Sequence, residues 1–311
     1  MSDISLFVAD AHCRGHLAGR DHPERPERFD AVKHGMERAG LVARMRRAGP
    51  RIATEDEVLL CHTPHYLKTA QHDIDSGVPF LSTGDTEITT SSWDVALRAV
   101  GGALSAVDAV ATGAARNAFC LLRPPGHHAN ASHGMGFCIF NNIAIAARYA
   151  QRAHGMARIM IVDWDVHHGN GTQDIFYQDP SVFFFSTHQW PLYPGTGRAD
   201  ETGEGAGEGA TMNFPFPAGA GRKEILGAVQ DRLLPAAANF RPDLVLISAG
   251  FDSRIGDPLG RFTLEDEDFA DLTHAVMGIT DGRVVSMLEG GYNLAGLGSA
   301  SAAHVEALID G

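Results

Sequence analysis

Short apolar runs that end abruptly in polar residues constrain the fold of this chain more than any other feature. The clearest run, residues 159–162, is followed at once by Asp163, Asp165 and His167. Three further apolar runs end in the same way, at residues 119–122, 244–249 and 284–288. Runs of this kind are typical of parallel strands buried on both faces. Because open α/β sheets place their sites at the carboxyl ends of strands, the polar clusters predict one shared site.

Stretches of helical character alternate with these runs, at residues 94–112, 142–154, 223–239 and 267–279. The alternation predicts an α/β fold, a three-layer α/β/α sandwich with a mainly parallel sheet. A chain of 311 residues with 44% hydrophobic content can bury a large core. No Pro/Ser-rich linker or repeat divides it, so we expect residues 1–311 to form a single domain.

The polar cluster after residue 162 has the composition of a metal site. Alternation along a strand would point Asp163, Asp165 and His167 the same way. Two carboxylates so close repel one another unless a cation or a proton lies between them. Catalytic zinc usually has three protein ligands and an open position, and Asp252 follows another apolar run. We therefore predict that Asp165, His167 and Asp252 bind Zn²⁺, with Fe²⁺ as the other metal that such donors accept. A plain polar loop is the alternative.

Three further residues supply the remaining groups for amide hydrolysis. Attack of metal-activated water on an acetamide needs a base, an acid and a donor for the oxyanion. His127 and His128 lie in a proline-stiffened loop, and Tyr292 follows two glycines that allow a sharp turn. The alternatives are two histidines satisfied in a structural turn and a tyrosine that caps one.

Several motifs together make the chain resemble the zinc-dependent histone deacetylase family, which includes bacterial histone deacetylase-like amidohydrolases and acetylpolyamine amidohydrolases. They occur in family order, as His-Pro-Glu-Arg-Pro-Glu-Arg at 22–28, Pro-Pro-Gly-His-His-Ala at 124–129, Gly-Phe-Cys at 136–138 with Asn-Asn at 141–142, the 163–171 segment, Gly-Phe-Asp at 250–252 with Gly-Asp-Pro-Leu-Gly at 256–260, and Glu-Gly-Gly-Tyr-Asn at 289–293. With Asn170, the chain resembles the class II branch of the family, because class I enzymes of higher organisms have aspartate at this position. The resemblance implies an arginase-like fold and a hydrolase of linear amide bonds.

The resemblance also implies roles for the candidate catalytic residues. His128 would be the general base and then the general acid, and His127 would give electrostatic support. Asp163 would bond to His127 and Asn170 to His128. Since a carboxylate favours imidazolium and a neutral amide does not, His128 should be the easier of the two to keep neutral. Tyr292 would place its hydroxyl against the substrate carbonyl, opposite the zinc.

Two structural potassium sites are implied by the same resemblance. The inner site would involve Asp163, Asp165, His167, Ser186 and Thr187. The second would use main-chain atoms of Phe176, Asp179 and Val182. Ordinary hydrogen bonding at strand ends is the alternative, above all for the second site.

The resemblance further implies a narrow acyl-lysine tunnel. Phe137 and Tyr193 would form its walls beside Gly136, with Leu259 at the mouth and Asp85 as a rim acid that holds the substrate backbone. Tyr193 replaces the usual phenylalanine.

The residue at position 259 helps to distinguish between acetyl-lysine and acetylpolyamine substrates. Polyamine-selective relatives tend to have an acidic gatekeeper at the mouth, so Leu259 favours acetyl-lysine in peptides or proteins. Residues 199–207, however, look more like acetylpolyamine amidohydrolases, and an acid from another loop could serve as gatekeeper. Arg28 would line an inner channel, or else be a buried arginine paired with Glu24 or Glu27.

Composition excludes other classes. A net charge of −13 without a basic cluster argues against direct nucleic-acid binding, and it either favours cationic substrates or serves solubility. No stretch approaches the roughly 20 apolar residues of a membrane helix, so we expect a cytoplasmic protein without membrane contact, and a homo-oligomer is possible.

The four scattered cysteines fit reduced thiols, with Cys138 either a buried filler or near the site. Residues 203–221 are glycine-rich but lack the ending of a phosphate loop, which predicts a flexible surface loop.

Two competing functions are disfavoured. An arginase-like ureohydrolase would need an Asp-x-His-x-Asp pattern, which the segment from Asp165 to Gly169 breaks. A non-catalytic relative would have lost a ligand, a histidine or the tyrosine, and all are present. We therefore expect a zinc-dependent amidohydrolase that deacetylates the ε-amine of lysine, with an acetylpolyamine amidohydrolase as the alternative.

Overall fold

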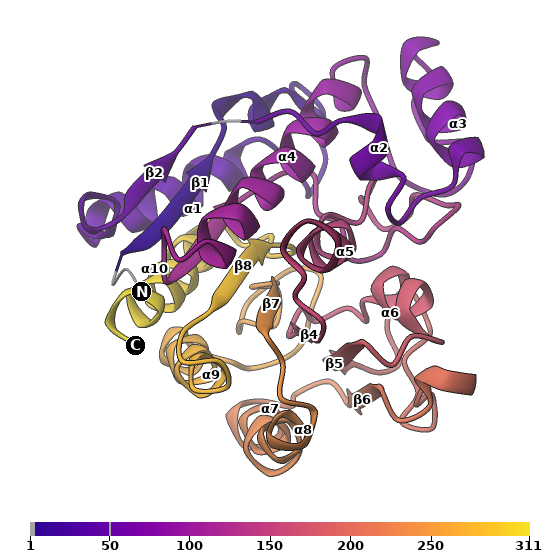
Figure 1. Cartoon of the computed structure of the whole chain (residues 1–311). Coiled ribbons are helices and arrows are strands. Elements are labelled where there is room, and N and C mark those ends of the chain that lie inside the picture. Colours follow the sequence, from indigo (N-terminus) through magenta and orange to yellow (C-terminus); the bar gives the residue numbers. More distant parts are fainter. Residues whose placement is uncertain (1–3, 50) are drawn as a thin grey trace.

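The computed structural model describes residues 4–49 and 51–311. Within these residues one eight-stranded sheet forms the centre of the molecule, and every neighbouring pair of strands is parallel (Figure 1). Its strand order is β2-β1-β3-β8-β7-β4-β5-β6. The strands are β1 (Ser5–Ala9), β2 (Arg46–Ala48), β3 (Asn117–Leu121), β4 (Ile159–Asp163), β5 (Val182–Gln189), β6 (Thr211–Phe216), β7 (Leu244–Ala249) and β8 (Val284–Leu288).

The central strands are apolar throughout because both of their faces are buried. In β4, Ile159 and Ile161 join one hydrophobic core, whereas Met160 and Val162 join the core on the opposite face. This is the two-residue alternation of a strand between two helical layers. The predicted three-layer α/β fold is confirmed, and the sheet is entirely parallel.

Helices cover each face of the sheet (Figure 1). One core is formed with α3 (Pro64–Asp75), α4 (Ser92–Ala111), α5 (Asn142–His154) and the short helices α2 (Glu55–Val58) and α6 (Asn170–Phe176). The other is formed with α1 (Glu27–Arg38), α7 (Arg222–Ala228), α8 (Leu234–Phe240), α9 (Asp266–Met277) and α10 (Leu294–Asp310). Three short 3-10 segments are η1 (Ala11–Gly15), η2 (Leu41–Arg44) and η3 (Gly205–Gly207).

The four predicted helices are confirmed with small changes at their ends. The helix expected at 223–239 is interrupted by one π-helical turn, η4 (Val229–Leu233), which separates α7 from α8. Pro235 is the second residue of α8, and proline disturbs the regular helical ladder because it lacks an N–H and crowds the preceding turn.

The prediction of a flexible loop over residues 203–221 is wrong, because this segment contains η3 and the edge strand β6. The glycines have another purpose: a Cβ on Gly207 would lie 2.6 Å from the carbonyl oxygen of Tyr177. Glycine therefore permits a close backbone approach here. Pro215 is tolerated in β6 because an edge strand leaves one side unpaired.

None of the helices among the described residues is long and apolar enough to cross a membrane. All four cysteines lie in the described part and are free and buried, in line with the predicted thiols.

Strand order determines where the site lies. The strands β3, β8, β7 and β4 are neighbours in the sheet although they are far apart in the sequence. Because the strands are parallel, the loops that follow them leave from the same edge, which brings the four polar clusters together.

Candidate active site

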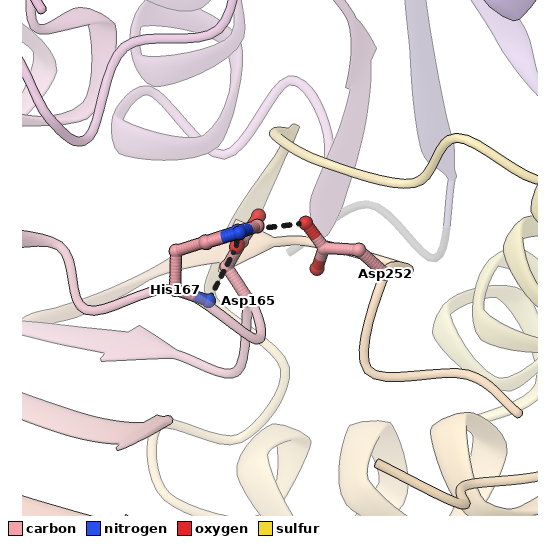
Figure 2. Close-up of side chains that lie close together, drawn as sticks. All are labelled: Asp165, His167 and Asp252. Atoms are coloured by element: carbon pink, nitrogen blue, oxygen red, sulfur yellow. Dashed lines mark hydrogen bonds and ion pairs between the residues drawn. The ribbon is translucent and has the colours of Figure 1, made fainter. Parts of the chain in front are cut away.

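A cluster of two carboxylates and one imidazole lies at the carboxyl edge of the sheet. Asp165 and His167 come from the loop after β4, and Asp252 comes from the loop after β7 (Figure 2). His167 Nδ1 lies 3.1 Å from Asp165 Oδ1 and 3.2 Å from Asp252 Oδ2, and all three residues are buried. Ligand atoms around a tetrahedral zinc ion are about 3.3 Å apart, given bonds of about 2.0–2.1 Å. The donor types and their spacing therefore fit Zn²⁺.

The surrounding backbone holds the carboxylates in place. The N–H of Gly290 donates to Asp165 Oδ2 over 2.8 Å, and that of Val166 donates to Asp252 Oδ1 over 2.9 Å. A Cβ on Gly290 would lie 2.0 Å from Asp252 Oδ2, so only glycine fits against the cluster. Such supporting contacts orient metal ligands.

The electrostatic environment of the cluster strongly favours a positive charge. Burial alone would lower the pKa of His167, but hydrogen bonds with Asp165 and Asp252 outweigh it and raise the pKa to about 10. Burial and the adjacent charge of Asp165 raise the pKa of Asp252 to about 7. A divalent cation would also neutralise these buried carboxylates, so the electrostatics and the geometry both fit a metal site.

Strand alternation is not what brings Asp165 and His167 together. β4 ends at Asp163, and the side chain of Asp163 accepts a hydrogen bond from His127 rather than joining the cluster. Asp165 and His167 lie beyond the end of the strand, so the predicted strand alternation does not extend to them. The loop conformation, and not the strand, aligns the two ligands.

The paired histidines differ in their hydrogen-bond partners. His127 Nδ1 donates to Asp163 Oδ2 over 2.9 Å, and His128 Nδ1 donates to Asn170 Oδ1 over 2.8 Å. Both rings are buried, with centroids 4.1 Å apart. The structure thus contains both hydrogen bonds that the sequence predicted.

These partners give the two imidazoles opposite charge preferences. Burial alone would lower the pKa of His127, but the charges of Asp163 and Asp165 raise it to about 10. Burial and the neighbouring charges of His127 and His167 hold the pKa of His128 well below its usual value. The two shifts favour a cationic ring for His127 and a neutral ring for His128 at neutral pH.

Glu289 supports the turn at residues 126–128, which contains the two histidines and is called the histidine turn below, although the sequence suggested no role for Glu289. Its Oε2 accepts hydrogen bonds from the N–H groups of Gly126, over 2.7 Å, and His127, over 3.2 Å. Its Oε1 is buried without a partner. The signal in the sequence was the position of Glu289 at the end of β8, the strand next to β3.

Tyr292 lies beside the cluster in a supported loop. Its N–H donates to Asp257 Oδ2 over 2.7 Å, and its ring packs edge-on against Phe137 with centroids 5.9 Å apart. Burial raises the pKa of the Tyr292 hydroxyl well above its usual value, so the hydroxyl stays protonated and can donate. Asp257 is a second supporting residue to which the sequence suggested no role.

Arg28 is a buried arginine beneath this loop. It pairs with Glu24 over 3.0 Å and donates to the carbonyl oxygens of Gly291, over 2.7 Å, and Glu289. Glu24 also accepts two hydrogen bonds from Arg123. The pairing of Arg28 with Glu24, one of the two predicted partners, is therefore present, and its role in a channel stays a prediction.

A pocket of about 320 Å³ opens above the cluster. It is lined by all five predicted substrate-binding residues, by His167 of the cluster, by His128 and Tyr292, and by one residue that the sequence did not suggest, Leu192. The full lining is Asp85, His128, Gly136, Phe137, His167, Leu192, Tyr193, Leu259 and Tyr292. A Cβ on Gly136 would lie 2.3 Å from the His128 ring, so glycine is required at this wall.

The residues of the two predicted potassium sites lie close to strand ends. Asp163 pairs in register with Ser186 and with Ser248, and the hydroxyls of Thr187 and Ser248 are buried without a partner. Buried hydroxyls of this kind suit an oxygen-coordinated cation.

Groups at the second predicted site also make hydrogen bonds within the chain. The carbonyl oxygens of Phe176 and Asp179 accept backbone hydrogen bonds from Asp179 and Val182. The Asp179 carboxylate pairs with Arg148, whose guanidinium lies 4.6 Å from the Phe176 ring centre.

Comparison with known proteins agrees with this architecture. Residues 22–308 match the histone deacetylase domain family. Histone deacetylase 14, chloroplastic, of Arabidopsis thaliana is 38% identical, with 99% of this chain and 78% of that protein covered. Polyamine deacetylase HDAC10 of Homo sapiens is 42% identical, with 92% of this chain and 44% of that protein covered. This chain thus spans less than half the length of the human relative. Two plant relatives carry the word chloroplastic in their names, so a cytoplasmic location stays a prediction.

A solved structure, the crystal structure of the HDA15 HD domain, superposes with a TM-score of 0.94 at 38% identity, covering 99% of this chain and 89% of that one. The likeness therefore extends over the whole sheet and its helical layers. The chain belongs to the histone deacetylase family and is a hydrolase of the amide-cleaving deacetylase type.

Proposed function

We propose that the protein is a zinc-dependent amidohydrolase that removes acetyl groups from the ε-amine of lysine in peptides or proteins, releasing acetate and the free amine. The observation that carries this proposal is a pocket with apolar walls, next to which lie a three-ligand cluster, a neutral imidazole and a protonated tyrosine hydroxyl. These are the groups that hydrolysis of an amide requires.

Asp165, His167 and Asp252 would hold the zinc ion. When bound there, zinc supplies Lewis-acid polarisation of an amide carbonyl and of a water molecule, whose pKa falls to about 7. The same donors accept Fe²⁺.

His128 is the proton carrier in this proposal. Because Asn170 Oδ1 accepts the Nδ1–H of His128, the lone pair of the neutral ring lies on Nε2. That nitrogen takes a proton from the attacking water and later gives it to the departing amine. The cationic ring of His127 stabilises the negative charge that develops during attack. Tyr292 donates its hydroxyl to the oxyanion.

The pocket walls suit a linear aliphatic chain. Phe137, Leu192, Tyr193 and Leu259 surround the space in which four methylene groups of lysine would lie. Leu259 at the mouth offers no charge to a second ammonium group, which favours acetyl-lysine.

An acetylpolyamine or another small acylated amine is the second candidate substrate. It is favoured by the similarity to proteins named polyamine deacetylase. Both substrates would be cleaved by the same chemistry.

We also propose that K⁺ binds at the inner site, held by Asp163, Ser186, Thr187 and oxygen atoms of the Asp165 to His167 loop. The unpartnered buried hydroxyl of Thr187 supports this assignment. A second K⁺ site is proposed at the main chain of Phe176, Asp179 and Val182, where the carbonyl oxygens of Phe176 and Asp179 each keep a lone pair beside their one backbone hydrogen bond.

The test is a comparison of kcat/KM for an acetyl-lysine peptide and for N-acetylputrescine on the zinc-loaded protein. Preference for the peptide supports lysine deacetylation, and preference for the amine replaces it with polyamine deacetylation. The control is Tyr292→Phe, which keeps the fold but removes the oxyanion donor and should lower kcat by about 10²-fold or more. Activity on neither substrate would overturn the proposal.

A further inference from the structure

The rim of the pocket contains a carboxylate that is held from two sides. Asp85 Oδ2 accepts a hydrogen bond from the Tyr193 hydroxyl over 3.0 Å, and Asp85 Oδ1 accepts one from the N–H of Gly136 over 2.8 Å. The three residues come from three separate loops, and all three line the pocket. Tyr193 therefore does more than supply an aromatic wall, because its hydroxyl connects two sides of the mouth.

The hydroxyl of Tyr193 is protonated and can donate a hydrogen bond. Burial and the adjacent charge of Asp85 raise the pKa of Tyr193 well above its usual value, so the group stays protonated. With phenylalanine at this position, Asp85 would retain only the contact with Gly136. An exposed aspartate with a single contact can rotate, whereas one with both oxygens engaged cannot do so freely.

The rim keeps free acceptor capacity on its solvent side. A carboxylate has about four lone-pair directions, and the contacts from Gly136 and from the Tyr193 hydroxyl, which also lies 3.3 Å from Asp85 Oδ1, do not use all of them. The Tyr193 oxygen also keeps its own lone pairs while it donates. Fixed oxygen acceptors therefore stand next to each other at the mouth, outside the acetamide-binding part of the pocket. Such acceptors suit N–H groups that a substrate carries beyond its acylated chain.

We propose that Tyr193 is a positioning residue that holds Asp85 as the acceptor for N–H donors of the substrate outside the pocket, and that it thereby sets the preference for peptides over bare acyl amines. This inference rests on the proposed function. It concerns which substrates bind well, whereas the chemistry at the cluster is common to all of them.

The first measurement compares Tyr193→Phe with the wild type on two substrates. One is an acetyl-lysine peptide, and the other is N-butylacetamide, which has the same four-carbon chain but no donor beyond its amide. We expect the ratio of their kcat/KM values to fall by about three- to tenfold, mainly through a higher KM for the peptide. An unchanged ratio would overturn the proposal, and an equal loss on both substrates would then show that Tyr193 acts only as a wall of the pocket.

A double-mutant cycle tests whether Tyr193 acts through Asp85. In an Asp85→Ala background, adding Tyr193→Phe should lower the kcat/KM for the peptide only slightly further. The reason is that the group which the hydroxyl positions is already gone. Full additivity of the two losses would contradict the proposal.

The matched control is Tyr149→Phe. It also removes a tyrosine hydroxyl that donates to an aspartate, Asp108, over 2.9 Å, but it lies on α5 away from the pocket lining. The substrate ratio should not change in this variant.

Failure of the proposed function can be recognised separately. If the wild type cleaves neither substrate, the function is wrong, and the rim is tested by the Kd of the acetyl-lysine peptide. A Kd that is about three- to tenfold weaker in Tyr193→Phe supports the positioning role, and an equal Kd overturns it.

Discussion

The Nδ1–H of His128 donates to the amide oxygen of Asn170, a neutral partner, over 2.8 Å. The adjacent His127 donates instead to a carboxylate, Asp163. The two rings are neighbours in the chain, but one has a neutral acceptor and the other an anionic one. Burial and the charges of His127 and His167 lower the pKa of His128, whereas the charges of Asp163 and Asp165 outweigh burial and raise that of His127.

Replacing Asn170 with aspartate should move the pH dependence of activity. A carboxylate beside His128 stabilises its imidazolium and raises its pKa, by about 1–3 units for a close pair. Since the base must be neutral, activity is present above this pKa and lost below it. The acidic limb of the kcat/KM profile should therefore shift to higher pH. An unshifted limb in the variant would argue against His128 as the base.

Removal of the metal should lower the melting temperature. Asp165 and Asp252 are buried close together, and a bound dication offsets their repulsion. Binding at about 100 times Kd stabilises a protein by about 2.7 kcal/mol. We expect a chelator to lower the Tm of the zinc-loaded protein by several degrees, and Asp252→Asn to reduce both zinc content and the chelator effect. Asp30→Asn, which changes a surface aspartate paired with Arg14, should behave like the wild type.

Glu289→Ala should damage catalysis through the histidine turn. The change leaves the N–H groups of Gly126 and His127 without their acceptor in a buried site, at a cost of about 1–3 kcal/mol for each group. We expect kcat to fall by about 10²-fold with little change in KM. Glu289→Gln retains an acceptor oxygen and should recover most of the loss. Equal losses in the two variants would mean that the charge of Glu289, and not its hydrogen bonds, is what matters.

Glu24 should make the stability of the protein depend on acid pH. Burial alone would raise its pKa, but the charge of Arg123 and further contacts lower it from 4.5 to about 2. The stabilisation is complete above pH 4.5 and is lost as the pH falls toward 2. A shift of this size corresponds to roughly 3 kcal/mol.

Urea unfolding between pH 5 and pH 3 measures this contribution. The free energy of unfolding should fall less steeply with decreasing pH in Glu24→Gln than in the wild type. Glu27→Gln changes an exposed glutamate on the same segment and should keep the wild-type slope. Parallel curves for Glu24→Gln and the wild type would refute the prediction.

Local pattern in the sequence was sufficient for the strand and helix assignments. Residues 159–163 are uniformly apolar up to Asp163 because both faces of that strand are buried, and burial leaves a direct signature in residue type. The candidate ligands and the histidine pair were also visible, because each follows such a run. The loop at 203–221 was misjudged because glycine that permits a close approach and glycine that permits motion look alike in a sequence.

By itself, the sequence determined the four apolar strands β3, β4, β7 and β8, the helical segments that alternate with them and the polar residues at the strand ends, since these follow from residue type and short-range spacing. Only the tertiary structure decided what those residues meet. Strand order brings Glu289 beneath Gly126, and two separate loops bring Tyr193 to Asp85, 108 residues apart in the chain. Such contacts depend on packing between distant segments, and no local preference of either residue encodes them.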